Sequence, residues 1–166
     1  TADFSICDSP VGSGKTTAVM AHLLRQAIDR KARRIFVVLP YTSIIQQSVK
    51  TYRKALVLPG EKSEEVVAEL HSRVEFEDYN LRYLTSLWRA PIIVTTAVAF
   101  FETIASNRPS TLRKFHELPG SIIFIDEAHK MTGRNSRAPF YYSVVDELSR
   151  RTAKPKFIFA SPNIPN

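Results

Sequence analysis

Short apolar runs, separated by segments with helical periodicity, constrain the fold of this chain more than any other feature. A run of four or five apolar residues has no polar face, which is typical of a strand buried on both faces of a sheet. The predicted strands are Phe4–Cys7, Ile35–Leu39, Val66–Leu70, Ile92–Thr95, Ile122–Ile125 and Phe157–Ala160.

Helical patterns fill most of the intervals between these runs. From Thr16 onward, apolar residues such as Val19, Leu23 and Ala27 recur at helical spacing, with polar residues on the other face. Further helices are predicted at Ser43–Leu56, Tyr79–Arg89, Val98–Ala105 and Phe140–Leu148, and the basic, proline-bounded stretch 106–120 has room for a short one. Strands alternating with helices predict an α/β domain with a mostly parallel sheet and helices on both faces. The 166 residues suit one such domain, spanning 1–166.

The stretch CDSPVGSGKTT, residues 7–17, lies between the first predicted strand and the first predicted helix. A phosphate-binding loop of the pattern G-x-x-x-x-G-K-[ST] requires that context. Its glycines let backbone N–H groups turn towards phosphate oxygens, and the following helix N-terminus favours the same anion. The predicted ligand is a chain of phosphates with Mg²⁺, and the predicted cofactor-binding residues are Gly12, Ser13, Gly14, Lys15, Thr16 and Thr17.

Two side chains of this loop have predicted roles. Lys15 is expected to reach the β- and γ-phosphates, and the Thr16 hydroxyl is expected to bind Mg²⁺. Ser9 stands where the first glycine of the pattern belongs, and a small residue there is tolerated. A glycine-rich turn that only connects strand to helix is the alternative. It is disfavoured because lysine and threonine follow the last glycine directly.

A pair of carboxylates ends another apolar run in IIFIDEAH, residues 122–129. Ligands of open α/β sheets bind at the carboxyl ends of the strands. Asp126 is therefore predicted to hold Mg²⁺, and Glu127 to orient and activate the water that attacks the γ-phosphate. Glu127, Asp126 and Lys15 are the predicted catalytic residues. The alternative for the pair is a helix N-cap followed by a favourable first-turn acid.

With these residues in place, the chain resembles the DEAH-type helicases and translocases of superfamily 2. Asp-Glu-Ala-His at 126–129 is their signature, and LPYTSIIQQ at 39–47 looks like their motif Ia. VTT at 94–96 resembles a nucleic-acid-contacting motif, and FASPNIP at 159–165 stands where Ser-Ala-Thr is expected. The resemblance implies the first of two RecA-like motor domains, with His129 and Ser161 coupling hydrolysis to movement.

A narrower resemblance concerns the helicase part of the CRISPR-associated helicase–nuclease of type I systems. LHSR at 70–73 and the segment 90–129 are similar to that family. The resemblance implies an ATP-driven motor on single-stranded DNA, with a second RecA-like domain, a metal-dependent nuclease domain and an RNA-guided surveillance complex as partners. Two alternatives stay open. One is another superfamily 2 enzyme, such as a restriction translocase or an RNA helicase. The other is a nucleotide-binding docking module without motor activity.

Four hydroxyl residues match the nucleic-acid-contacting motifs. Thr42 and Ser43 are expected at a helix start, and Thr95 and Thr96 just past a strand, where hydroxyls and backbone N–H groups meet phosphates. Helix capping is the alternative for each. His71 is a further, weaker candidate for the DNA path.

Two departures from the helicase pattern have expected consequences. Ser161-Pro162-Asn163 replaces Ser-Ala-Thr, which we expect to alter coupling rather than nucleotide binding. The second motor domain, which would supply an arginine finger, is absent from residues 1–166, so this fragment is expected to bind ATP weakly and hydrolyse it poorly.

Charge and cysteine usage bear on partners and compartment. The net charge is +7, although residues 61–78 alone carry seven acids and two bases. The remaining basic excess suits a polyanion such as nucleic acid, or a solvated basic surface. One cysteine, Cys7, is consistent with a reducing compartment, so a cytoplasmic location is expected. No run is long enough to cross a membrane, no membrane partner is expected, and the histidines and Cys7 lack zinc-site spacing.

Overall fold

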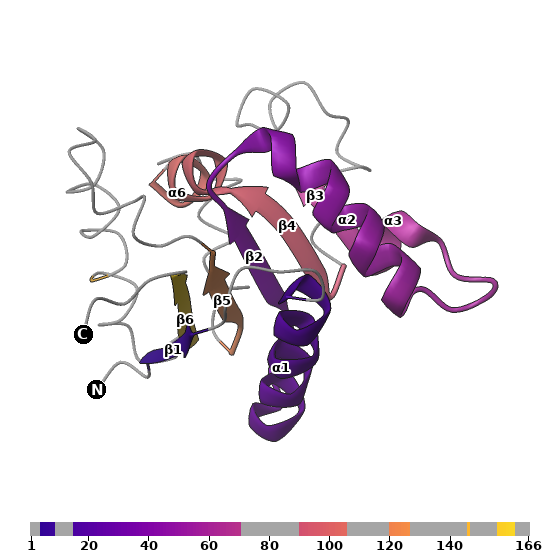
Figure 1. Cartoon of the computed structure of the whole chain (residues 1–166), viewed down its shortest axis with the longest axis horizontal. Coiled ribbons are helices and arrows are strands. Elements are labelled where there is room, and N and C mark those ends of the chain that lie inside the picture. The colour runs from indigo at the N-terminus through magenta and orange to yellow at the C-terminus, as the bar shows by residue number, and fades with distance from the viewer. Residues whose placement is uncertain are drawn as a thin grey trace.

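The structure is a computed structural model that describes residues 4–8, 15–70, 90–105, 120–126, 146 and 156–161. Side chains are described at 17–70, 90–102, 120–126, 146 and 156–159. The strands are β1 (Phe4–Asp8), β2 (Ile35–Leu39), β3 (Val67–Leu70), β4 (Ile92–Thr96), β5 (Ile122–Ile125) and β6 (Lys156–Ser161). The helices are α1 (Lys15–Arg30), α2 (Thr42–Leu56), α3 (Ser63–Val66) and α6 (Ala97–Ala105). Figure 1 shows their arrangement.

The predicted strands are all present, and all of their bounds agree within one residue. The predicted helix starts at Thr16, Ser43 and Val98 each lie one residue past the observed start. The short helix α3 was not predicted, and it takes Val66 out of the predicted strand. The predicted helix Tyr79–Arg89 and the stretch 106–120 lie outside the described residues, as does all of Phe140–Leu148 except Asp146.

The six strands form one sheet in the order β1-β6-β5-β2-β4-β3, and every neighbouring pair is parallel. This confirms the parallel α/β architecture. The chain crosses from β1 over β6 and β5 to reach β2, and its last described strand inserts between β1 and β5. Because all strands run the same way, their carboxyl ends share one edge of the sheet.

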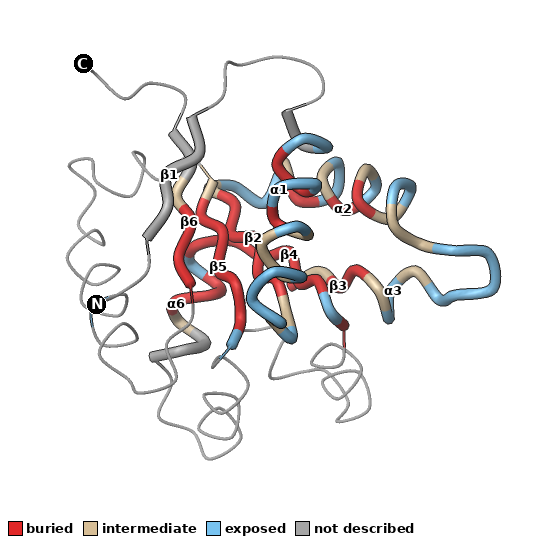
Figure 2. Tube along the Cα trace, turned by 90° about the horizontal axis from the view of Figure 1, so that it is seen from below, coloured by how far each residue is buried: buried red, intermediate tan, exposed pale blue. Residues whose placement is uncertain are grey.

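Helices cover both faces, because successive residues of a strand point to opposite sides. In β2, Ile35, Val37 and Leu39 pack in one cluster with the buried residues of α1 and α2. Phe36 and Val38 point the other way and pack with Phe100 and Phe101 of α6. All five residues of β2 are buried, as Figure 2 shows for the centre of the sheet.

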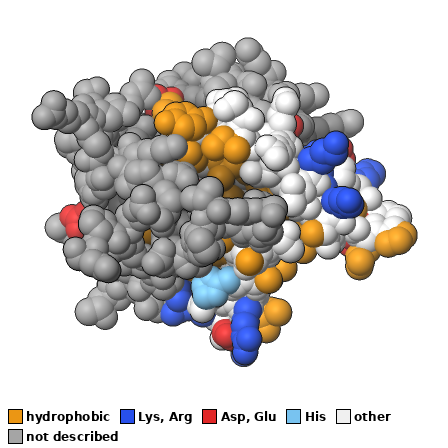
Figure 3. Space-filling view, in the orientation of Figure 1, with side chains coloured by type: hydrophobic (Ala, Val, Ile, Leu, Met, Phe, Trp, Pro, Cys, Tyr) orange, Lys and Arg blue, Asp and Glu red, His pale blue; other side chains and the backbone are white. Residues whose placement is uncertain are grey.

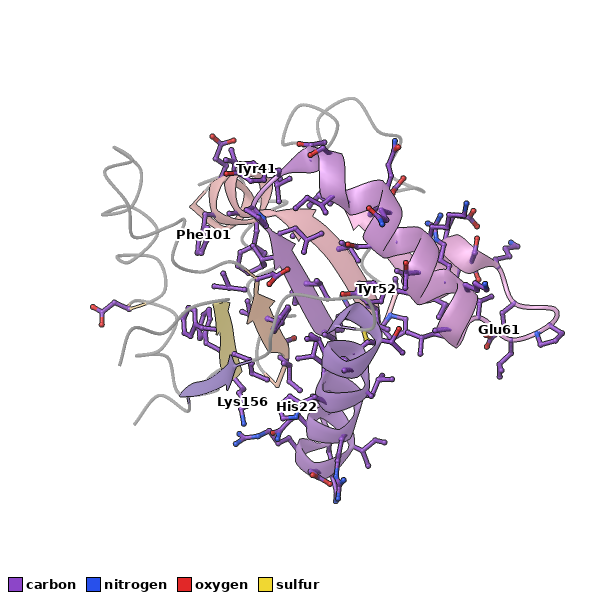
Figure 4. All side chains as sticks on the ribbon, viewed as in Figure 1. His22, Tyr41, Tyr52, Glu61, Phe101 and Lys156 are labelled. Carbon is purple, nitrogen blue, oxygen red and sulfur yellow. The ribbon has the colours of Figure 1, made fainter. Side chains whose placement is uncertain are left out.

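Side-chain hydrogen bonds fasten two helices to the sheet. Lys156 Nζ, on the amino end of β6, donates to Gln26 Oε1 of α1 at 2.9 Å, and Figure 4 places Lys156 beside that helix. Arg53 of α2 donates from Nε and Nη2 to the Val67 carbonyl oxygen, at 3.1 and 2.9 Å. These contacts fix how α1 and α2 lie on the sheet.

Helix α1 ends in a Schellman motif. The Ala32 N–H donates to the Ala27 carbonyl, and the Lys31 N–H donates to the Ile28 carbonyl. Lys31 has φ 53°, the left-handed conformation that this motif requires. Among the helices of the described segments, none has the length and apolar character needed to cross a bilayer.

Candidate nucleotide and nucleic-acid site

The carboxyl edge of the sheet brings together the segments that carry the predicted site. β1 ends at Asp8 and α1 begins at Lys15, so the strand and the helix on either side of residues 9–14 follow in the predicted order. Lys15 and Thr16 form the first turn of α1, and Thr17 follows with an exposed side chain. Gly12, Ser13 and Gly14 lie outside the described residues. An anion at the start of α1 would face the positive end of a 16-residue helix.

Asp126 follows directly on β5 and is partly exposed. Its backbone N–H donates to the Val38 carbonyl oxygen at 2.9 Å, which holds it beside the carboxyl end of β2. A partly exposed carboxylate at this edge fits the hard oxygen ligand that Mg²⁺ prefers. Glu127 and His129 lie outside the described residues. Within the described part of the chain, no group of three or more His, Cys, Asp or Glu residues is placed to hold a metal ion alone.

Strand β6 lies between the strands that lead to the phosphate loop and to Asp126. Ser161 is in register with Asp8 of β1, and Phe159 is in register with Ile125 of β5. The backbone of Ser161 therefore sits at the same edge, between the ends of β1 and β5.

Thr42 and Ser43 occupy the first two positions of α2, and both are exposed. The N-cap residue is Tyr41, which is extended (φ −136°, ψ 146°) and makes no side-chain capping hydrogen bond. Thr42 is therefore not the N-cap of α2, because it is the first residue inside the helix. The first turn of α2 presents hydroxyls at the edge where ligands bind.

Thr95 and Thr96 are buried, with 0% and 5% of their surface exposed. Thr96 is the residue before α6, and its Oγ1 accepts a hydrogen bond from the Ala99 N–H at 3.1 Å. The Thr95 hydroxyl donates to the Thr96 carbonyl oxygen at 3.4 Å. The capping alternative is thus present at Thr96, and a DNA contact by either hydroxyl stays a prediction. His71 lies outside the described residues.

Two tyrosines on the same segment were not among the predicted site residues. Tyr41 is 52% exposed at the start of α2, whereas Tyr52 is 3% exposed on its inner face. Figure 4 shows Tyr41 near α6 and Tyr52 further along α2. Burial, together with the negative charge of Asp126, raises the pKa of Tyr52 well above its usual value.

The fold and this edge define a RecA-like α/β domain of the helicase type, which binds nucleotide. A family model described as "DEAD/DEAH box helicase" matches residues 3–165. The chain belongs to the DEAD/DEAH box helicase family. No curated protein matches the chain in sequence.

Solved structures agree on the fold. The Hef helicase domain of Pyrococcus furiosus is similar at TM-score 0.64 and 19% identity, with 99% of this chain and 30% of that chain covered. The DEAD-box helicase Mss116 bound to ssRNA and UDP-BeF gives TM-score 0.69 and 15% identity, covering 99% of this chain and 32% of that one. The DUF1998 helicase MrfA, bound to DNA and AMPPNP, gives 0.66 and 16%, covering 99% of this chain and 22% of that one. The chain therefore spans a third or less of these structures, and none of their names mentions a CRISPR system.

Proposed function

We propose that this chain is the first motor domain of a DNA helicase or translocase that hydrolyses Mg-ATP to move along single-stranded DNA in CRISPR interference. One observation carries the motor part of the proposal. β1 ends at Asp8, β6 ends at Ser161 and β5 runs into Asp126 at the same edge of a parallel sheet, and α1 begins at Lys15, seven residues after Asp8. That arrangement suits a phosphate loop facing a metal-binding carboxylate.

The chain's own residues divide the chemistry at this edge. Mg-ATP supplies the phosphoanhydride bond whose cleavage releases free energy. Lys15 would hold the β- and γ-phosphates, and the start of α1 adds its positive end. Thr16 and Asp126 would hold the metal. Glu127 would accept a proton from the attacking water, and His129 and Ser161 would pass the change to the DNA side.

The nucleic-acid part rests on the start of α2. Thr42 and Ser43 are exposed there, and the N-cap residue Tyr41 makes no capping hydrogen bond with its side chain. The basic excess of the whole chain, +7, favours a polyanion. Thr95 and Thr96 are weaker candidates for a DNA contact, because both residues are buried. DNA is preferred over RNA on the sequence resemblance alone, since similar folds occur with DNA in MrfA and with ssRNA in Mss116.

The CRISPR assignment rests on the resemblance of 70–73 and 90–129. The same resemblance carries the proposed partners, which are a second RecA-like domain, a nuclease domain and a surveillance complex. The proposed location is the cytoplasm. A restriction translocase or an RNA helicase would share the same motor domain, and a docking module would share only the fold. The protein sequence on either side of residues 1–166 separates the first two readings, because a nuclease domain beside the motor favours the CRISPR type.

The decisive experiment measures ATP binding and hydrolysis in the full-length protein that contains this chain. Lys15→Ala should remove most affinity for Mg-ATP, since it deletes the ammonium nearest the phosphates. Glu127→Gln should leave binding largely intact and lower turnover by about 10²-fold or more, because the water loses its base. Lys62→Ala and Glu65→Gln, an exposed ion pair on and beside α3, are the matched controls.

The outcomes separate the readings. Turnover unchanged by Glu127→Gln means that Glu127 is not the base, and equal affinities for wild type and Lys15→Ala mean that the loop does not hold phosphate. If single-stranded RNA stimulates turnover and DNA does not, the protein is an RNA helicase. If neither single-stranded DNA nor RNA stimulates turnover while ATP still binds, the protein is a docking module without motor activity.

A further inference from the structure

Two helix ends lie at the amino edge of the sheet, opposite the edge of the predicted nucleotide site. α1 ends at Arg30 shortly before β2 begins, so its end lies at the amino edge. α2 ends at Leu56, and the chain then turns through α3 into the start of β3, which brings it to the same edge. Partly buried residues from both ends pack against one hydrophobic cluster: Ala27, Ala32, Leu56 and Val66. The two helix ends therefore cover one part of the core.

The end of α1 is basic and exposes one large apolar side chain. Ile28 is 77% exposed. Arg25 and Lys31 are also exposed, and they lie three residues before and after Ile28, about one helical turn away on each side. Arg33 is exposed two residues before β2, and Asp29 is the one acid of the segment. Figure 3 shows charged and hydrophobic side chains together at this lower end of α1. We call residues 25–33 the α1 tip.

The turn between α2 and α3 is acidic and exposes a second large apolar side chain. Leu58 is 65% exposed. Its N–H donates to Glu61 Oε2 at 2.9 Å, and the Glu61 N–H donates to the Leu58 carbonyl oxygen at 3.1 Å, so the turn has a fixed shape. Glu64 and Glu65 are exposed in α3, and the one base, Lys62, lies 3.3 Å from Glu65. Figure 4 places Glu61 at this outer end of the molecule. We call residues 58–65 the α3 turn.

The α1 tip and the α3 turn have opposite charge, and each has one exposed apolar residue among its charged ones. They do not cover each other within one chain, because Ile28 and Leu58 are both largely exposed. A second copy related by a two-fold axis would bring each α1 tip against an α3 turn, so the same contact would form twice. Each contact would have an apolar centre and a charged rim, as protein interfaces do. A polyanion would be attracted by the α1 tip and repelled by the α3 turn.

We infer that the amino edge is a self-association surface, on which the α1 tip of one copy binds the α3 turn of a second copy and the reverse, with Ile28 against Leu58. The contact lies at the edge opposite Asp126, so it leaves the predicted nucleotide site of both copies free. The inference goes beyond the proposed function and does not depend on it. Because the two contacts are small and their charges are exposed, the dimer is weak and sensitive to salt.

Sedimentation equilibrium of the full-length protein over a concentration series tests the inference. Wild type should show a reversible monomer–dimer equilibrium that shifts towards monomer between about 0.05 M and 0.5 M salt. The double variant Arg25→Glu with Lys31→Glu makes the α1 tip acidic, and Glu64→Lys with Glu65→Lys makes the α3 turn basic. Each should raise the dissociation constant of the dimer at least about 10-fold, because like charges then face each other in both contacts. Lys50→Glu, an exposed charge reversal within α2, should leave it unchanged.

Mixing the two double variants separates lost complementarity from lost folding. An equimolar mixture should form a dimer with one copy of each, because both contacts regain opposite charges. Leu58→Ser should also raise the dissociation constant at least about 10-fold, since the side chain is buried twice in a two-fold dimer, whereas Leu58→Met should keep most of the affinity.

Four results would overturn the inference. Wild type could stay monomeric up to about 100 μM at low salt, which excludes even a weak dimer. The mixture of double variants could stay monomeric, or Lys50→Glu could weaken the dimer as much as they do. Assemblies that grow beyond two copies would show a head-to-tail contact instead of a two-fold one. Finally, a monomeric wild type that binds heparin, with binding lost in Arg25→Glu with Lys31→Glu, would make the α1 tip a polyanion site.

Discussion

At the scale of single residues, Thr96 has a structural role that the sequence left open. Its hydroxyl accepts the Ala99 N–H at 3.1 Å and so satisfies one of the free donors at the start of α6. The residue is 5% exposed, which leaves its hydroxyl little access to a DNA strand. A substitution at this position should therefore act first on stability.

We expect Thr96→Ala to lower the free energy of unfolding by about 1 to 2 kcal/mol, the usual cost of losing such a cap. Thr96→Ser keeps the hydroxyl and should retain most of the stability. Urea unfolding of both variants measures the difference, and single-strand affinity is measured in parallel. A loss of DNA affinity in Thr96→Ala without a loss of stability would reverse the assignment and make the residue a DNA contact.

At the scale of elements, α2 joins the two halves of the proposed mechanism. Its first turn lies at the proposed DNA interface, and its inner face carries Tyr52 within electrostatic reach of Asp126. Tyr52 is 3% exposed, so ionising it would place a charge in the core cluster under α1 and α2. The packing of α2 should therefore depend on the protonation of this phenol.

The sign of the pH dependence follows from the raised pKa of Tyr52. In the unfolded chain the phenol loses its proton near pH 10, while the folded protein holds it to higher pH. Above about pH 10 the unfolded state binds fewer protons than the folded state, so stability falls as pH rises, by up to about 1.4 kcal/mol per pH unit. Below pH 10 this phenol adds no pH dependence.

The measurement compares urea unfolding of wild type and Tyr52→Phe between pH 9 and pH 11. Wild type should lose about 1 kcal/mol more than the variant across that range, because phenylalanine has no proton to lose. Tyr41→Phe changes an exposed ring and serves as the control, with the wild-type pH dependence. If wild type and Tyr52→Phe lose the same stability, the Tyr52 phenol does not report on the packing of α2.

At the scale of the whole molecule, each of the three similar structures described above aligns with 99% of this chain, but the aligned part is only 22–32% of the other chain. In the proposed enzyme the ATP would be enclosed between this domain and a second one that supplies an arginine finger. Such a residue is worth roughly 10³- to 10⁵-fold in turnover. The proposed motor therefore depends on residues beyond 1–166.

We expect isolated residues 1–166 to turn over ATP at least about 10³-fold more slowly than the full-length protein. Single-stranded DNA should not stimulate that residual rate, because half of the proposed track is missing. A steady-state ATPase assay on both proteins, with and without DNA, tests this. The Glu127→Gln variant of the fragment sets the background. A fragment as active as the full-length protein would show that no second domain completes the site.

Much of the fold and part of the site could be predicted from local sequence. Runs such as IFVVL and IIFI have no polar face, and the structure buries them as β2 and β5. The strand before and the helix after the glycine-rich segment follow from an apolar run and from helical periodicity, and the placement of Asp126 at a strand end follows from the apolar run IIFI. The short helix α3 was missed because its four residues, SEEV, are too few to carry a periodic signal.

Sequence by itself determined the parallel α/β class, the helix start near Lys15 and the strand end before Asp126, because periodicity and strand polarity act locally along the chain. Tertiary structure alone decided which strands are neighbours, placing β6 between β1 and β5 through pairing across about 150 residues. It also decided that Thr96 is a buried cap, and that Tyr41 is exposed while Tyr52 is not. Burial of a side chain depends on what packs over it, and the covering residues come from distant strands and helices.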